Sequence, residues 1–488
     1  MCALCAFSCN SAVSDGKKAA QPEWKKRLPI VQADMRRDCS KSEARKTSEA
    51  NKIITIYQLQ PRMFTPEGTM RAAEKLLPHI KELGVDAIYI CPLVLADDDP
   101  DKAFWSRRQK KAGNPRNPYR LKDYFKIDPE YGTEADVKSF VAAAHKLGMR
   151  VIFDLVYYHC GPTANLLNMD KDFVRRDAHG NVVLGRWNFP ELNFDNPKLR
   201  EYMWGNMEYF VKEFDIDGYR TDVEHYVPLD FWEEGARRMR KLKPNFLMLA
   251  ESRRPACQLE AYDINYDWTY FEAARKVYAE NAPASSIVES EKNLRKLFPK
   301  NARVLRYTEN HDEAMNYGDK RPDMAWPCGA YDSALFAVFA LDGVPLIYNG
   351  IEVADNAGHN FLASKAVDKL CINWSMALTP KGKARFELLK RLVFLRKKLP
   401  ALVNTWAEWL DNTAPQAVLS FARTYQNQKL VGMVNTKGAA QKFEIDVSKL
   451  GAQKVFASHI DRGAKWSLEG GTLNVELAPY GFALLELR

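Results

Sequence analysis

Long apolar runs, internal repeats and low-complexity tracts are all missing from this chain of 488 residues. Nothing after the first few residues approaches the ~20 consecutive apolar residues that a membrane-spanning helix needs, so we expect no integral membrane domain. Hydrophobic residues make up 46% of the sequence and charged residues 27%, the proportions of an ordinary globular protein. The length allows one large domain plus a smaller one, or three of ordinary size.

Cysteine patterns typical of metal sites or disulfide frameworks are missing as well. The nine cysteines are odd in number and scattered along the chain. Cys2 and Cys5 form a lone CxxC pair, which is weak evidence for a metal or redox site without a second pair. The cysteines therefore give no reason to expect a cofactor.

A nucleic-acid-binding module is also absent, although the formal net charge is +9. Basic residues are concentrated in the first 50 residues and in the segment WSRRQKKAGNPRNPYRLK, residues 105–122. Charge alone does not predict nucleic-acid binding when no recognisable module accompanies it, so we expect no nucleic-acid partner. The segment 105–122 is interpreted as a solvated loop; a patch that attracts anionic partners or substrates remains the alternative.

The first 20 residues resemble the tail of an export signal, with a short apolar run followed by small and polar residues. They lack a basic start, and the apolar run is shorter than usual. They loosely resemble a bacterial lipoprotein signal whose lipid anchor would be at Cys9. A disordered cytoplasmic tail is an equally open interpretation, so both export to the periplasm or cell surface and a cytoplasmic location remain. Residues 10–49 are polar, and we assign 1–49 to a signal-like segment and disordered linker.

From residue 50 to 402 the sequence alternates between β-like and helix-like segments. The helical segments, such as 134–148 and 384–402, show apolar residues at helical spacing. Strands that alternate with helices of ~10–15 residues predict βαβ units and a parallel sheet. Eight such units predict an α/β fold, a (β/α)8 TIM barrel. The expected strands are 53–59, 86–93, 149–159, 216–222, 245–252, 262–268, 303–310 and 344–350.

After residue 402 the pattern changes to short alternating strands separated by polar turns. This predicts a C-terminal antiparallel β domain, a β-sandwich, over residues 403–488. Its expected strands are 417–425, 429–436, 442–447, 472–477 and 482–487. Between the third barrel strand and its helix, residues of about 160–197 are long enough for a small inserted lobe.

Acids, histidines and an arginine follow four of the expected barrel strands, at the end where barrel active sites lie. Taken singly, an Asp after a strand is often a helix cap, and a lone His is usually structural. Arg220 and Asp222 lie two apart on one strand and share a face, so alone they would predict an ordinary ion pair. Coincidence at four strands of one barrel favours a catalytic site instead. The residues are Asp154, His159, Arg220, Asp222, Glu251, Asn310, His311 and Asp312.

These four segments resemble the four short signature regions of the α-amylase superfamily of retaining glycoside hydrolases, in the same order. The stretches 117–159 and 343–352 resemble the regions around that family's third and eighth strands, and the similarity runs from about residue 53 to the C-terminus. The resemblance implies that Asp222 is the nucleophile, Glu251 the general acid/base, and Asp312 a third carboxylate that binds and distorts the sugar.

The same resemblance implies a set of residues around the sugar. Arg220, His159 and His311 would surround the ring, Tyr119 would form an aromatic platform, and Asp154 would support the arginine. Asn310 and His225 complete the candidate substrate-binding residues, with a carbohydrate as partner.

Retaining glycoside hydrolysis requires these residue types for physical reasons. One carboxylic acid protonates the leaving oxygen, and a carboxylate ~5 Å away traps the sugar covalently. The two carboxyl groups must differ in pKa. We expect Arg220 to lower the pKa of Asp222, since a nearby opposite charge typically lowers an Asp pKa by ~1–3 units. The apolar segment FLMLA before Glu251 would raise the pKa of that residue.

The sequence departs from the family at its calcium site. Many relatives carry an Asn immediately before the His of the third strand, and that Asn ligates a structural calcium ion. Tyr158 stands there and cannot replace it, and we cannot assemble the six to eight oxygen ligands that calcium prefers. We therefore predict no calcium site of the usual kind. His225 and Tyr226 also replace a frequent Lys-His pair.

The resulting prediction is a retaining α-glycoside hydrolase that acts on α-linked glucans or oligosaccharides. A transglycosylase or sugar isomerase on the same scaffold is the alternative, because it would use the same catalytic residues. A non-catalytic member of the superfamily is disfavoured because all three acids are present. Linkage preference and attack within the chain or at its end are left open.

Overall fold

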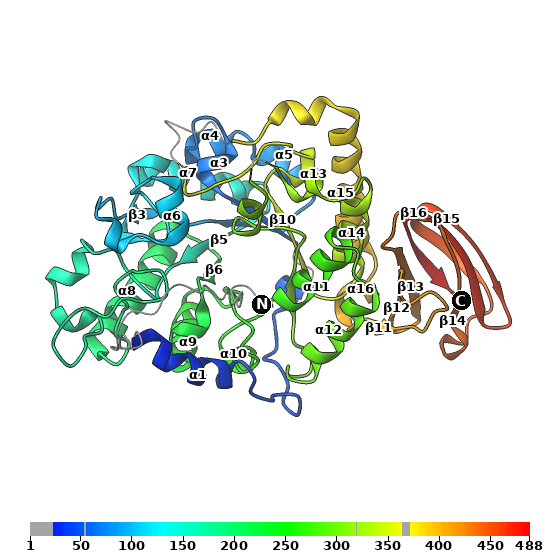
Figure 1. The fold of residues 1–488 in the computed structure, drawn as a ribbon, viewed down its shortest axis with the longest axis horizontal. Helices are drawn as coiled ribbons and strands as arrows, with labels where there is room; N and C mark the ends of the chain where they lie inside the picture. Colours follow the sequence, from blue (N-terminus) through cyan, green and yellow to red (C-terminus); the bar gives the residue numbers. More distant parts are fainter. Residues whose placement is uncertain (1–22, 53–54, 319, 364–370) are drawn as a thin grey trace, which may run out of the picture.

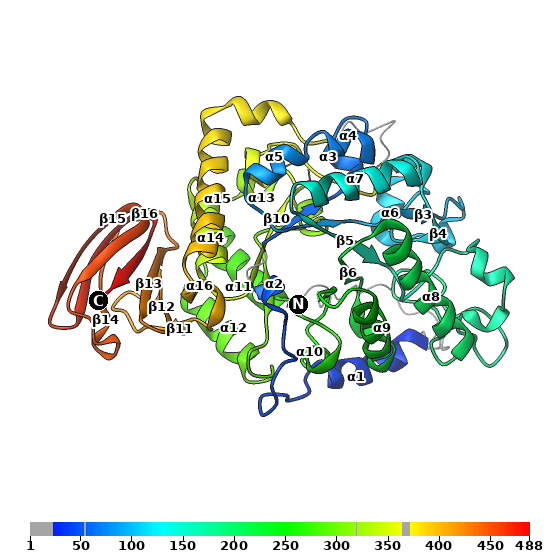
Figure 2. The same cartoon turned by 180° about the vertical axis from the view of Figure 1, so that it is seen from behind.

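The computed structural model describes residues 23–52, 55–318, 320–363 and 371–488. Its centre is a closed barrel of parallel strands, which confirms the predicted fold class (Figures 1 and 2). The strands are hydrogen-bonded in the circular order β1-β10-β9-β8-β7-β6-β5-β2. Their bounds are β1 Ile56–Leu59, β2 Ala87–Ile90, β5 Arg150–Leu155, β6 Gly218–Thr221, β7 Leu247–Ala250, β8 Ile264–Tyr266, β9 Val304–Arg306 and β10 Val344–Tyr348. Residues 53–54 of the first expected strand lie outside the described residues.

The barrel interior explains where the polar site can form. Every barrel strand except β6 contributes to one buried apolar cluster that includes Ile56, Tyr89, Leu249 and Tyr266. On β6 the corresponding positions are Gly218 and Arg220, which pair in register with Ile152 and Asp154 of β5. A side chain at position 218 would collide with the carbonyl oxygen of Leu247, 2.7 Å from an ideal Cβ. Below the level of Arg220 the barrel interior is therefore packed with apolar groups. At Arg220 the interior becomes charged.

Helices cover the outside of the barrel, with sequence signals at their ends. Thr133 and Asp136 form a capping box at the start of α7, and Asn196 caps α8. Between β1 and β2 the chain forms two short helices, α4 and α5, and Pro78 lies in the first turn of α5. The principal helices are α4 Met70–Glu74, α5 Leu77–Glu82, α7 Glu134–Lys146, α8 Pro197–Phe214, α9 Leu229–Leu242, α11 Trp268–Ala279, α12 Ser285–Arg295, α14 Ala330–Ala340 and α15 Pro380–Lys398.

Two excursions rise from the barrel near its C-terminal end. Between β2 and β5 the chain forms a two-stranded ribbon of β3 Val94–Ala96 and β4 Leu121–Ile127, with the short helix α6 Arg107–Ala112 between them. The sequence did not predict this ribbon, which carries most of the basic segment 105–122. After β5, residues 160–196 contain two 3-10 turns, Asn165–Asn168 and Lys171–Phe173, and isolated β-bridges.

The C-terminal strands form one hydrogen-bonded antiparallel sheet in the order β11-β12-β13-β16-β14, with β15 paired to β16. The separate strands expected over 472–477 and 482–487 are two halves of β16, which pair with β14 and β13 respectively. The sandwich expected here is thus one bent sheet around a common apolar core. The strands are β11 Glu408–Trp409, β12 Val418–Tyr425, β13 Gln428–Asn435, β14 Gln441–Asp446, β15 Val455–Glu469 and β16 Thr472–Leu487.

The assignment of residues 10–49 to a linker outside the fold is wrong for the described part. Residues Glu23–Asp34 form helix α1, which lies beside α9 in both views (Figures 1 and 2). Arg27 pairs with the buried Glu191, and Asp34 Oδ2 lies 2.7 Å from Nε of Arg254. The polar composition suggested disorder because such contacts depend on barrel residues far away in sequence. Cys9 lies outside the described residues.

In the part of the chain that the structure describes, no helix combines the length and apolarity needed to cross a bilayer.

Candidate active site

The predicted catalytic residues meet at the C-terminal ends of the barrel strands. Arg220 is fully buried at the end of β6, between Asp154 of β5 and the residue that follows β7, Glu251. Parallel strands in a closed barrel bring their ends to one face, so residues distant in sequence share one pocket. Each of these side chains occupies an inward position of its strand or the first residues after it.

Arg220 contacts three carboxyl groups at once. Its Nη1 donates to Asp154 Oδ1 at 2.8 Å and to Asp222 Oδ1 at 2.9 Å, and its Nη2 lies 2.6 Å from Glu251 Oε2. The backbone N–H of Val223 donates to the same Glu251 oxygen at 2.8 Å. The ion pair between Arg220 and Asp222 therefore exists, and it also positions the two predicted catalytic carboxyls beside each other.

The pKa values of the two carboxyls follow from this crowding. Burial raises the pKa of Asp222 well above its ordinary value, and the negative charges of Glu251 and Asp154 add to burial against the opposing effect of Arg220. Arg220 does lower this pKa, as expected, but burial and the two neighbouring acids outweigh it, so the net shift is upward. Burial also raises the pKa of Glu251 to about 7. One guanidinium faces three buried carboxyl groups, and burial therefore favours the protonated forms of Asp222 and Glu251 despite its charge.

Tyr119 and His311 form one wall of the pocket. Their rings stack with centroids 5.3 Å apart and planes 9° apart, and Tyr119 Oη lies 2.7 Å from His311 Nε2. Burial lowers the pKa of His311 to about 4, so the ring is neutral at pH 7. Gln58 Nε2 lies 2.7 Å from Nδ1 of His311. Since the amide can only donate, the network assigns the ring proton to Nε2 and lets the Tyr119 hydroxyl donate to Asp154, 3.0 Å away.

Asp312 lies at the mouth of the pocket, where its side chain is 36% exposed. Its Oδ1 accepts a hydrogen bond from Nη1 of Arg108 at 3.0 Å. Its Oδ2 lies 3.7 Å from His311 Nε2. Partial burial opposes ionisation, but His311, Arg108 and Arg220 together hold the pKa of Asp312 below its ordinary value. Asp312 is thus the ionised acid of the three.

The other candidates hold the pocket in shape. His159 is buried with its Nε2 2.8 Å from the carbonyl oxygen of Tyr119, which fixes the aromatic wall. Asn310 Oδ1 accepts hydrogen bonds from the backbone N–H groups of Asp312 and Glu313, both at 2.9 Å. His225 is buried, and its carbonyl oxygen accepts from Arg254 Nη2 at 2.7 Å.

Three residues of the site were missed by the sequence analysis. Gln58 orients His311, the Tyr89 hydroxyl donates to Asp154 Oδ2 at 2.6 Å, and Arg108 reaches Asp312. Gln58 and Tyr89 carried a usable signal, because each places a polar group within an otherwise apolar barrel strand. Arg108 carried none, since it lies in a basic segment 204 residues from Asp312.

The surroundings of Tyr158 do not fit a calcium ion. Its ring stacks on Tyr226 with centroids 4.6 Å apart, and its hydroxyl lies 3.4 Å from Glu191 Oε2. Glu191 in turn faces the guanidinium groups of Arg27 and Arg175. Within the described ranges, no group of three or more His, Cys, Asp or Glu side chains is placed to hold a metal ion.

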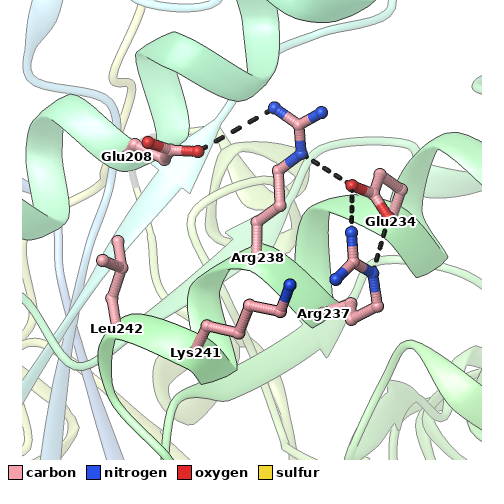
Figure 3. A pocket seen from close by; sticks show the side chains of 6 residues that line it. All are labelled: Glu208, Glu234, Arg237, Arg238, Lys241 and Leu242. Carbon is pink, nitrogen blue, oxygen red and sulfur yellow. Dashed lines mark hydrogen bonds and ion pairs between the residues drawn. The ribbon is translucent and has the colours of Figure 1, made fainter.

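Two hollows lie outside the catalytic pocket. One of about 300 Å³ lies on the outer helices α8 and α9, where Arg237 and Arg238 pair with Glu234 (Figure 3). Its acidic and arginine side chains form ion pairs with one another. The hollow lies on the outer helices, away from the strand ends. The second, of about 630 Å³, lies under α1 and reaches His225 and Tyr226.

Comparison with known proteins identifies the family. The description "Alpha amylase, catalytic domain" matches residues 35–177 and 182–385, and "Maltogenic Amylase, C-terminal domain" matches residues 408–484. A cyclomaltodextrinase of Geobacillus thermopakistaniensis is 26% identical over 86% of this chain and 70% of its own length. An intracellular maltogenic amylase of Bacillus subtilis is 24% identical over 77% of this chain and 63% of its own length.

Solved structures agree in fold. A noncanonic maltogenic α-amylase from Thermotoga neapolitana superposes with a TM-score of 0.76 at 22% identity, covering 90% of this chain and 100% of that one. An α-amylase from Lactobacillus plantarum gives a TM-score of 0.71 at 24% identity over 90% and 100%. The family matches together cover most of the chain, including the strand ends that hold the three acids. The chain belongs to the α-amylase family of glycoside hydrolases.

Proposed function

We propose that this protein hydrolyses α-glucosidic bonds in α-linked glucans or oligosaccharides by a double displacement. Asp222 is the nucleophile, Glu251 the general acid/base, and Asp312 the carboxylate that binds the sugar. The observation that carries this proposal is the contact of one buried guanidinium, Arg220, with both Asp222 and Glu251. Family membership and the names of the relatives, cyclomaltodextrinase and maltogenic amylase, support the same substrate class.

The pKa of Glu251, which burial raises to about 7, supports both catalytic roles near neutral pH. In the reactive form Glu251 holds the proton and Asp222 is ionised. Asp222 attacks the anomeric carbon while Glu251 protonates the leaving oxygen. Glu251 then carries a negative charge, which the donors on its Oε2, Arg220 Nη2 and Val223 N, stabilise. In the second step Glu251 removes a proton from water, which attacks the anomeric carbon and releases Asp222.

The remaining residues bind the sugar ring. Tyr119 offers a flat face stacked against His311, whose Nε2–H donates to the Tyr119 oxygen in the free enzyme. Asp312 is ionised and accepts hydrogen bonds from sugar hydroxyls. These bonds strengthen as the ring approaches its oxocarbenium-like transition state.

Transglycosylation or isomerisation is the alternative outcome of the same covalent intermediate. It differs only in whether water or a sugar hydroxyl resolves the intermediate, and no contact in the pocket favours the second. Hydrolysis is the proposal because it requires no second saccharide. A lipid anchor at Cys9 and the absence of a nucleic-acid partner remain predictions from sequence.

We also propose that the fold is maintained without the calcium ion of the family. The support is local, because positively charged side chains already surround the carboxylate nearest to Tyr158. Glu191 Oε1 pairs with Arg27 and lies 3.4 Å from Nε of Arg175. A cation placed there would be repelled by both guanidinium groups.

The direct test is a substrate screen with the anomeric form of the product recorded. Starch, pullulan, maltooligosaccharides, sucrose and trehalose are incubated with the full chain, and proton NMR follows the first turnovers. The proposal expects new reducing ends that appear first as the α-anomer. An initial β-anomer contradicts the double displacement, abundant longer saccharides favour transglycosylation, and no cleavage of any substrate overturns the proposal.

A further inference from the structure

Arg108 reaches Asp312 from the same excursion that carries Tyr119. It belongs to α6, in the ribbon between β2 and β5. Its Nη1 donates to Asp312 Oδ1 at 3.0 Å, and its Nη2 donates to Asn316 Oδ1 at 3.1 Å. Asn316 is held in turn by its Nδ2, which donates to Glu313 Oε2 at 2.8 Å. The guanidinium therefore links α6 to the segment after β9 through both of its terminal nitrogens, Nη1 and Nη2.

The helix that carries Arg108 is fixed in place. The next residue, Gln109, is buried, and its Nε2 donates to the carbonyl oxygens of Asn114 at 3.1 Å and Pro115 at 2.9 Å. Arg120 is also buried, and its Nη2 donates to the carbonyl oxygens of Asp97 at 3.1 Å and Asp99 at 2.7 Å. The backbone of α6 is thus anchored, and only the long side chain of Arg108 is left to move.

The order of strands tells which side of the pocket Arg108 spans. In the ring β1-β10-β9-β8-β7-β6-β5-β2, the catalytic acids Asp222 and Glu251 follow β6 and β7. The strands directly opposite these two are β10 and β1. Arg108 follows β2 and Asp312 follows β9, and these strands flank β1 and β10. The bridge from Arg108 to Asp312 therefore lies over the side of the barrel opposite the two catalytic acids.

A bound sugar has a fixed direction relative to the barrel strands. Its anomeric carbon must face Asp222, and its leaving oxygen must face Glu251. The far edge of the ring, which carries the next sugar of a longer chain, then points toward the side of β1 and β10. The Arg108 guanidinium, which is held on Asp312, lies on the same side.

We propose that Arg108 is a specificity-determining residue that closes the non-reducing side of the pocket after one glucosyl residue. The enzyme then attacks chain ends or short α-glucosides and transfers a single glucosyl residue per turnover. When that residue binds, its hydroxyls replace Arg108 on Asp312, and the guanidinium donates to the outer hydroxyls. The exchange requires little energy because exposed ion pairs are weak, and the Arg108 side chain is 49% exposed. This inference rests on the proposed function.

The test uses two nitrophenyl maltooligosaccharides that differ only in a blocking group on the non-reducing end. Chromatography of the products, with no auxiliary glycosidase added, reports the cleavage of both. We expect the wild-type protein to cleave the free-ended substrate and to leave the blocked one almost untouched. Arg108→Ala should raise the ratio of blocked to free-ended cleavage by about tenfold or more. Arg108→Lys, which keeps the charge but loses the two-ended contact, should give an intermediate ratio.

Lys111→Ala is the matched control, because Lys111 is exposed on the same helix and its loss removes the same charge. It should leave the ratio unchanged. Equal cleavage of both substrates by the wild-type protein overturns the inference alone, as does an unchanged ratio in Arg108→Ala with wild-type melting temperature. No cleavage of either substrate overturns the proposed function itself, and the two failures are therefore distinguishable.

Discussion

At the level of single residues, the chemistry depends on one guanidinium that contacts three carboxyl groups. Arg220 is fully buried, and its partners Asp154, Asp222 and Glu251 have side chains at most 11% exposed. In such surroundings a full set of negative charges is costly, and a proton relieves it. Arg220, whose ion pair looked structural in the sequence, therefore favours the ionised acids, while burial and the repulsion between the acids favour protonation.

Replacing the nucleophile should separate catalysis from folding. Asp222→Asn is expected to lower kcat by roughly three orders of magnitude or more. It removes one negative charge from an overcrowded cluster, so the melting temperature should stay equal or rise slightly. Both are measured on the same preparation, by product release and thermal unfolding. Substantial residual turnover would place the nucleophile elsewhere.

The pH dependence follows from the pKa of Glu251, about 7 in the folded protein. Since Glu251 acts as an acid in the first step, kcat/KM should fall as pH rises through about 7. A folded-state pKa above the unfolded value means that folding favours the protonated form. The stability that the protonated form contributes is therefore fully present below the unfolded value of 4.5 and is lost as pH rises through about 7.

Glu251→Gln tests that sign. The variant should lose activity, and at pH 8 it should be more stable than the wild-type protein by on the order of 1–3 kcal/mol. At pH 4 the difference should nearly vanish, because Glu251 is then largely protonated in both the folded and the unfolded protein. Urea unfolding at both values measures it. A variant that is less stable than wild type at pH 8 would contradict the raised pKa.

At the level of elements, helix α1 is one part of the fold that the sequence did not predict. Its two ion pairs reach barrel residues that are almost wholly buried, since the side chains of Glu191 and Arg254 are both 4% exposed. Each also has another partner, Arg175 for Glu191 and Glu224 for Arg254. The helix therefore adds to an existing network, and its contribution should be moderate.

Arg27→Ala should cost roughly 1 kcal/mol, which lowers the melting temperature by about 1 °C in a chain of this size. The reason is that Glu191 stays buried with Arg175 as its remaining partner. Gln32→Ala, at an exposed position of α1, is the control and should change little. Differential scanning calorimetry compares them, and equal melting temperatures in both variants would show that α1 does not contribute through this pair.

The loop residues near Tyr158 lead to a prediction about metal removal. Because Glu191 already faces two guanidinium groups, a strong chelator should leave the melting temperature within about 2 °C of its value in added calcium. Thermal unfolding in both buffers provides the measurement. A large fall on chelation would refute the proposal that the fold is maintained without calcium.

Across the whole molecule, the barrel was predictable because its strands are short apolar runs separated by amphipathic helices. The eight strands were found, and their polar ends marked the site, because a closed barrel brings all strand ends together. The strand β15 was missed because it alternates exposed and half-buried residues and carries many polar groups. The two segments of β16 were separated at Pro479, where the structure continues as one bent strand.

The site residues could be predicted from the sequence only where they lie close to the end of a strand. Asp222, Glu251 and Asp312 lie within a few residues of β6, β7 and β9, and local sequence marks them. Arg108 and the lowered pKa expected for Asp222 show where that reasoning ends. A contact across 204 residues, and the burial of several acids beside one another, depend on three-dimensional packing that no local pattern records.

The central claim is that the side chain of Asp222 forms the covalent bond to the sugar. A fluorinated glucosyl donor that forms the intermediate but hydrolyses slowly should label the wild-type protein once per chain. Peptide mapping by mass spectrometry then locates the modified residue. A label on Asp222 that is absent from Asp222→Asn is the predicted result, and a label on Glu251 or Asp312 would contradict the account.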